Sequence, residues 1–137
     1  MDLQLGGRSA LITGGSKGIG FSIARFLAAE GCKLHLVARS ATDLEAARQK
    51  LASEHGVQVT TYAMDLAQRG GAQALAAKCP DLDILVNNAG STPRGSILEV
   101  DEDRFRAAFD LKVFGYINLC REFYRQMKAR RKGVIIN

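Results

Sequence analysis

Short apolar runs alternate along the chain with longer stretches that are apolar on one side only. The runs with the length and aliphatic content of buried strands are residues 8–13, 33–38, 57–64, 82–86 and 134–137. The stretches whose apolar residues recur at helical steps of three and four are residues 18–30, 42–55, 72–78 and 101–131. The pattern therefore predicts that strands and helices alternate, from a first strand to a fifth.

Residues that commonly begin or end helices lie at the ends of the predicted helical stretches. Gly31 and Gly56 follow the first two helical stretches, and Pro80 follows the third. Ser40 or Thr42 can cap the second helix at its start. We therefore expect separate helices rather than one long amphipathic segment.

Alternation of this kind is typical of an α/β fold, in which right-handed crossovers place helices on both faces of a parallel sheet. We expect a doubly wound sheet of the Rossmann type. No repeat, low-complexity segment or linker divides the chain. Residues 1–137 are thus expected to form a single domain, with the fifth strand left unfinished at Asn137.

The last helical stretch is the longest and is predicted to be one helix over residues 101–131. Its apolar stripe consists of Phe105, Phe109, Val113, Ile117, Cys120, Tyr124 and Met127. We expect this stripe to pack in the core or in an interface.

A glycine-rich turn connects the first strand to the first helix, where residues 13–20 are TGGSKGIG. Glycine permits positive φ and close approach of a ligand, while the free N–H groups of the following helix attract an anion. The turn predicts a site for the pyrophosphate of a dinucleotide, or else only close packing of strand and helix. A P-loop is excluded, because Lys17 is followed by glycine rather than by Ser or Thr.

Similar signals follow the second, third and fourth predicted strands. They are Ala38-Arg39, Asp65-Leu66 and the NNAG sequence of residues 87–90. In doubly wound sheets, ligands bind outside the carboxyl ends of the strands. Because all these residues fall at that one edge, the sequence favours a dinucleotide site over a turn that serves packing alone.

The composition narrows the protein class. Hydrophobic residues make up 47% of the chain and charged residues 24%, as in folded soluble domains. No apolar run has the length of a membrane span, and Asp2 is unlike the start of a signal peptide. The cysteines are odd in number and form no CxxC pair. We expect reduced, buried thiols, no metal site and a cytoplasmic protein.

The net charge of +5 is concentrated near the end of the last predicted helix. The basic residues there are Arg121, Arg125, Lys128, Arg130, Arg131 and Lys132. Cations complement the dipole at a helix C-terminus, and only Phe123 and Tyr124 could stack between them. We interpret this cluster as a solvated helix end and expect no nucleic-acid partner.

With the TGGSKGIG turn, Asp65-Leu66 and NNAG in these places, the whole chain resembles the short-chain dehydrogenase/reductase family. The resemblance implies hydride transfer between a nicotinamide and a small-molecule carbonyl or alcohol. By the same resemblance, the residues that hold the pyrophosphate and ribose would be Gly14, Ser16, Gly18, Ile19 and Gly20. Asp65 and Leu66 would contact the adenine, while Asn87, Ala89 and Gly90 would form the ribose wall and steady the sheet.

Cofactor choice depends on the end of the second strand. An NAD-binding protein places an acid there for the ribose 2′-OH, whereas this chain has Ala38-Arg39. A guanidinium suits a phosphate, and Lys17 could supply a second cation. The sequence favours NADP(H); NAD(H) is the alternative if both cations are ordinary solvated loop residues.

Two departures from the family pattern concern catalysis. Lys112 stands where the family has an asparagine of the proton relay, so it is either an altered relay residue that donates but cannot accept, or an ordinary helix lysine. The family's serine and tyrosine–lysine pair have no counterpart here. Tyr124 and Lys128 have the spacing of that pair but lie on the wrong helix.

We therefore expect the intact parent to be the enzyme and the 137-residue chain alone to be inactive. A non-catalytic dinucleotide-binding or redox-sensing module is the alternative function. The resemblance also implies a homo-oligomer, a dimer or tetramer paired through the helix at residues 101–131.

Overall fold

A computed structural model describes residues 3–137 and contains a five-stranded parallel sheet in the order β3-β2-β1-β4-β5. The strands are β1 (Ser9–Thr13), β2 (Lys33–Ala38), β3 (Val59–Ala63), β4 (Ile84–Val86) and β5 (Val134–Ile136). The helical elements are α1 (Gly18–Ala29), α2 (Ala41–His55), α3 (Gly71–Lys78), α4 (Glu102–Phe109), η1 (Asp110–Gly115) and α5 (Tyr116–Arg130). The predicted doubly wound α/β fold is confirmed.

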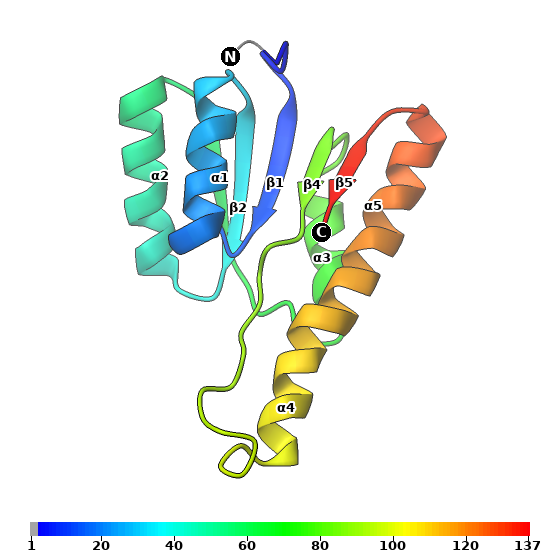
Figure 1. The fold of residues 1–137 in the computed structure, drawn as a ribbon. Helices are drawn as coiled ribbons and strands as arrows, with labels where there is room; N and C mark the ends of the chain where they lie inside the picture. The colour runs from blue at the N-terminus through cyan, green and yellow to red at the C-terminus, as the bar shows by residue number, and fades with distance from the viewer. Residues whose placement is uncertain (1–2) are drawn as a thin grey trace.

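The helices cover both faces of the sheet (Figure 1). Helices α1 and α2 lie over one face, and α3 and α5 lie over the other. Alternate strand residues feed the two cores: Ala10 and Ile12 of β1 pack under α1 and α2, while Leu11 packs under α3 and α5. This is the period-two pattern of a strand that is buried on both sides.

The local signals at helix ends act as predicted. The Ser40 hydroxyl accepts a hydrogen bond from the Asp43 N–H at 3.2 Å and so caps α2. Gly56 ends the same helix with a φ of +66°, which favours glycine. These two residues fix where α2 begins and ends, and α2 begins beside the carboxyl end of β2.

The prediction of one α-helix over residues 101–131 is wrong in one respect. The segment is α-helical at both ends, but η1 between them is a π-helical turn. Of the predicted apolar stripe, Met127 is buried in the core, whereas Phe109, Ile117 and Tyr124 are exposed, so their place in an interface stays a prediction. A second stripe, which shares Met127, faces the sheet: Gly115, Leu119, Phe123 and Met127. The helix carries two apolar stripes, and the wider turn of η1 changes the register between α4 and α5.

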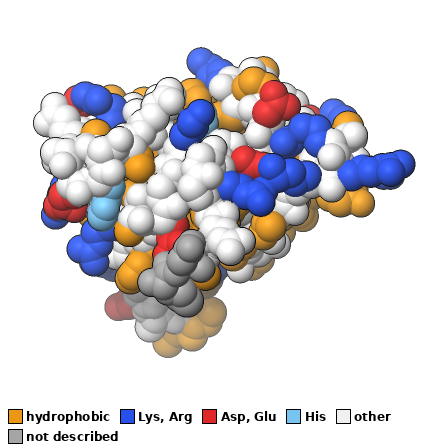
Figure 2. Space-filling view, turned by 90° about the horizontal axis from the view of Figure 1, so that it is seen from above, with side chains coloured by type: hydrophobic (Ala, Val, Ile, Leu, Met, Phe, Trp, Pro, Cys, Tyr) orange, Lys and Arg blue, Asp and Glu red, His pale blue; other side chains and the backbone are white. Residues whose placement is uncertain are grey.

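The amino ends of the strands carry the basic cluster. Viewed from that end, Lys and Arg side chains gather on the side where α5 ends (Figure 2). Some of them are bound to the sheet: Lys132 Nζ lies 3.0 Å from the Asp83 carboxylate, and Arg130 donates to the Leu82 carbonyl at 2.5 Å. Burial raises the pKa of Asp83, but the Ser9 N–H and Lys132 outweigh it and hold that pKa below its usual range. Part of the positive charge therefore anchors α5.

Helices in the described part of the chain are too short or too polar to cross a membrane. Within the same residues there is also no group of three or more His, Cys, Asp or Glu side chains placed to hold a metal ion.

Candidate functional site

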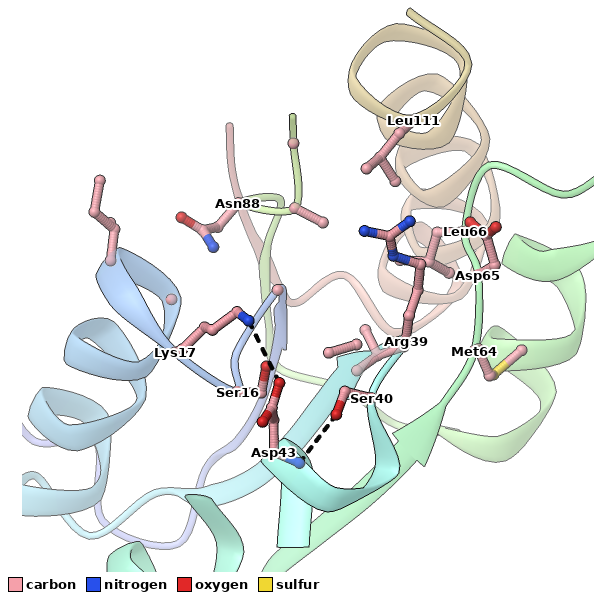
Figure 3. Close-up of a pocket in the computed structure, with 17 residues that line it drawn as sticks. Ser16, Lys17, Arg39, Ser40, Asp43, Met64, Asp65, Leu66, Asn88 and Leu111 are labelled. Atoms are coloured by element: carbon pink, nitrogen blue, oxygen red, sulfur yellow. Dashed lines mark hydrogen bonds and ion pairs between the residues drawn. The ribbon is translucent and has the colours of Figure 1, made fainter. Parts of the chain in front are cut away.

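A pocket of about 430 Å³ opens at the carboxyl ends of β1 to β4 (Figure 3). It is lined by residues that the sequence predicted for the site: Gly14, Ser16, Lys17, Ile19, Gly20, Arg39, Asp65, Leu66, Ala89 and Gly90. Two further lining residues, Ala38 and Asn88, belong to the predicted Ala38-Arg39 and NNAG signals but were given no role of their own. The lining residues outside these signals are Val37, Ser40, Asp43, Met64 and Leu111. The predicted site residues among them, which are up to 76 residues apart in sequence, line one cavity.

Gly14 and Gly20 of the glycine turn leave no room for a Cβ atom. Gly14 has a φ of +66°, and a Cβ there would lie 3.1 Å from the Ala89 Cα. A Cβ on Gly20 would overlap the carbonyl oxygen of Gly14. The first turn of α1 is thus packed directly against the turn, and its free N–H groups face the pocket side of the sheet.

Two side chains fasten the glycine turn to the loop after β4. The Thr13 hydroxyl accepts hydrogen bonds from the N–H groups of Asn88 at 2.9 Å and Ala89 at 2.8 Å. The Asn88 amide donates back to the Thr13 carbonyl at 2.9 Å. The sequence analysis gave Asn88 no role of its own, although it belongs to the NNAG sequence.

Two of the predicted site residues, Asn87 and Gly18, do not line this pocket. Asn87 is buried, and its amide donates to Asn137 Oδ1 at 2.8 Å and to Cys120 Sγ at 3.3 Å. Successive residues after a strand point in opposite directions, so Asn87 turns toward β5 and α5 while Asn88 turns toward the glycine turn. Gly18 begins α1 with a φ of +58° and borders a shallower hollow beside the pocket.

Two cations and one carboxylate set the charge at the α2 end of the pocket. Lys17 Nζ lies 3.4 Å from Asp43 Oδ2, and both side chains are drawn with this contact in Figure 3. Arg39 forms no hydrogen bond or ion pair with any residue of the described chain, and its guanidinium reaches toward Leu66 and Leu111.

Apolar side chains bound the pocket on the α3 side. Leu66 is buried, and Met64 and Leu111 line the same part of the wall. The Asp65 carboxylate accepts the Ala67 N–H at 3.0 Å, which holds the turn after β3 in place. This part of the cavity suits a flat ring, whereas the glycine turn suits an anion.

Lys112 lies at the rim, on η1. Its side chain is exposed, and its Cδ would lie 3.6 Å from a Cβ placed on Gly90. Tyr124, by contrast, is exposed on α5 and borders a separate groove with Ile117 and Cys120. Lys112 therefore lies beside Gly90 of the pocket lining without lining the pocket itself, and neither Tyr124 nor Lys128 lines it.

Residues 8–137 match the family model described as short chain dehydrogenase. Among curated relatives, a 3-oxoacyl-(acyl-carrier-protein) reductase of Chlamydia trachomatis is 31% identical over 134 residues. That alignment covers 95% of this chain and 54% of the relative. The chain thus spans about half the length of the curated relatives it matches.

Solved structures with the same fold include L-sorbose reductase from Gluconobacter frateurii, complexed with NADPH and L-sorbose. The TM-score is 0.91 at 36% identity, over 98% of this chain and 53% of that one. A short-chain dehydrogenase from Sphingobium yanoikuyae in complex with NADPH has a TM-score of 0.86 at 28% identity, over 93% and 52%.

Proposed function

The chain belongs to the short-chain dehydrogenase family of oxidoreductases, and from this premise we propose that it forms the NADP(H)-binding part of an enzyme that interconverts a carbonyl and an alcohol. One observation carries the proposal. The glycine turn, Arg39 and Asp65-Leu66 line a single pocket at the carboxyl edge of the sheet. That edge is where open α/β sheets bind dinucleotides.

The residues present fit the dinucleotide. A pyrophosphate needs close approach to the backbone, and Gly14 and Gly20 keep the turn free of side chains that would block it. The N-terminus of α1 adds N–H donors and a positive partial charge. Ser16 and Ile19 line the same wall.

The other end of the pocket fits the adenosine half. We assign Asp65 and Leu66 to the adenine, because a carboxylate accepts from an exocyclic amine and the apolar wall accepts the ring. Ala89 and Gly90 leave space for a ribose along the β4 loop. When bound, the nicotinamide donates or accepts the hydride.

NADP(H) is favoured over NAD(H) by the charge after β2. Arg39 stands where an acid would accept the ribose 2′-OH of NAD, and it has no partner among the described residues. A guanidinium that is free of other ion pairs can bind a phosphate bidentately. Both solved structures reported above contain NADPH, which supports this choice.

Titration tests the assignment. We expect the 137-residue chain to bind NADPH at least about tenfold more tightly than NADH, a difference of about 1.4 kcal/mol in binding free energy. Nicotinamide fluorescence follows the binding of each dinucleotide. Arg39→Gln should remove most of this preference by weakening NADPH alone. Arg25→Gln is the matched control, because Arg25 is exposed on α1 and lies outside the pocket. Equal affinity of the wild-type chain for both dinucleotides would contradict the choice of NADP(H).

The role of Lys112 is a separate proposal. It occupies the position of the family's relay asparagine, next to Gly90, and as a charged amine it can donate but not accept. The chain holds no tyrosine–lysine pair at the pocket, so we expect no turnover of NADPH with a carbonyl by the 137-residue chain alone. Turnover well above buffer would contradict this expectation. Saturable dinucleotide binding by a full-length protein that reduces no carbonyl would favour the non-catalytic module.

The exposed stripe of α4 to α5 supports the proposed homo-oligomer. Phe109, Phe114, Ile117 and Tyr124 are each about half exposed or more, and apolar side chains in such numbers commonly lie in interfaces. Substrate class is proposed only as a small-molecule carbonyl or alcohol.

A further inference from the structure

We propose that Asp43 limits the discrimination between NADPH and NADH by competing with the 2′-phosphate for Lys17. The inference rests on the proposed dinucleotide site and names a residue that tunes its specificity. It comes from the ion pair between Lys17 Nζ and Asp43 Oδ2 at 3.4 Å, within the pocket wall that both residues share with Arg39.

The backbone holds the Asp43 carboxylate in place. Asp43 lies in the first turn of α2, and its N–H donates to the Ser40 hydroxyl at 3.2 Å. A negative side chain at this end of a helix is stabilised by the helix dipole. The acid is therefore a fixed feature of the α2 start, whereas Lys17 approaches it from the glycine turn across the pocket (Figure 3).

The two cations near this site are not equivalent. Arg39 is free of partners in the described chain, while Lys17 already has a counter-ion. The Lys17 and Asp43 side chains are 82% and 43% exposed, so the pair is well solvated and weak. A phosphate dianion that binds Lys17 must displace the carboxylate from it, so the energy of the Lys17–Asp43 pair is lost when the phosphate binds.

A nucleotide without the 2′-phosphate meets a different situation. It brings no charge to compete for Lys17, so the Lys17–Asp43 pair can persist. Asp43 should therefore weaken NADPH binding and leave NADH binding nearly unchanged. Specificity would be set by the pair as a whole rather than by the cations alone.

The test is a double-mutant cycle on dissociation constants for NADPH and NADH. Asp43→Asn keeps the shape and the cap from Ser40 but removes the charge. We expect it to lower the dissociation constant for NADPH about three- to fivefold, because Lys17 is released from a solvated ion pair. The dissociation constant for NADH should change by less than about 1.5-fold. Asp43→Ser is a second variant that suits a helix start and should give the same result.

Two further variants isolate the cause. Glu54→Gln removes one negative charge from the same helix at its far end, outside the pocket, and should leave both affinities unchanged. In a Lys17→Gln background, Asp43→Asn should lose most of its effect on NADPH, because no amine remains to be released. The gain in wild type should also shrink at high salt, since the pair is exposed.

Each outcome decides the matter. A gain for NADPH alone that depends on Lys17 supports the proposal. Equal gains for both nucleotides, no gain, or the same gain without Lys17 would each overturn the competition. Loss of all binding in the wild-type chain, with its far-ultraviolet circular dichroism intact, would instead overturn the proposed dinucleotide site.

Discussion

The two faces of the sheet are packed by side chains of different size and polarity. Under α1 and α2, the buried side chains of α1 are those of the small Ala24 and Ala28, with Phe21, Ile23 and Leu27 partly buried beside them. Under α3 and α5, the fully buried helix residues include the larger Leu75, Leu119 and Phe123. Two polar side chains, His35 and Tyr62, also lie with Cys79 on that second face.

The difference follows from what each helix must do. The start of α1 has to lie against the glycine turn, and small side chains permit a close approach to the sheet. No such constraint acts on α5, whose large side chains fill the space beneath it while its outer stripe stays exposed. The first face positions the pocket, and the second face holds the largest fully buried side chain, that of Phe123.

The largest expected effect comes from the second face. Phe123→Ala empties a fully buried site and should lower the free energy of unfolding by about 3–5 kcal/mol. Lys128→Ala is the matched control, because Lys128 is exposed on the same helix and lies outside the apolar stripes. It should change stability by less than about 0.5 kcal/mol. Urea unfolding followed by circular dichroism measures both, and equal losses would contradict the assignment of the buried stripe.

On the first face, a single methyl group should affect stability and binding together. Gly20→Ala places a Cβ against the Gly14 carbonyl and should cost about 1–3 kcal/mol of stability. It should also lower the affinity for NADPH by more than about tenfold, because the turn must shift away from the pyrophosphate. Gly6→Ala adds the same methyl group where no atom lies within 4 Å, and should do neither. A Gly20→Ala protein with normal binding would show that the turn does not need this close contact.

The smallest expected effect is a pH dependence of stability that comes from His35, which lies beside Tyr62 on the second face. Tyr62 OH lies 3.0 Å from His35 Nδ1 and donates to the Lys78 carbonyl, and burial lowers the pKa of His35 below its ordinary 6.5. The folded chain therefore keeps His35 neutral where the unfolded chain takes up a proton. Stability should fall as the pH drops below 6.5, by at most about 1.4 kcal/mol per pH unit.

The control for this pH dependence is His35→Gln, which cannot titrate. Urea unfolding at pH 7.0 and pH 5.5 should show a loss in the wild-type chain that this variant lacks. An identical loss in both proteins would assign the pH dependence to other groups.

Much of the molecule follows from local sequence. The strand and helix order, the cap at Ser40 and the glycine turn depend on residues within a few positions of one another. The common edge of the site follows as well, because parallel strands must end on the same side. For these reasons most of the pocket-lining residues after β1, β2 and β3 could be predicted.

The sequence could not decide which way particular side chains face. Residues 101–131 carry two apolar stripes of similar strength, and only the π-helical turn of η1 and the packing of Phe123 against the sheet select one of them. Asn87 and Asn88 are adjacent and chemically identical, yet Asn137 binds one and Thr13 the other. The Lys17–Asp43 pair joins residues 26 apart. Periodicity determines secondary structure because it is local, whereas these choices depend on partners that only the folded chain brings together.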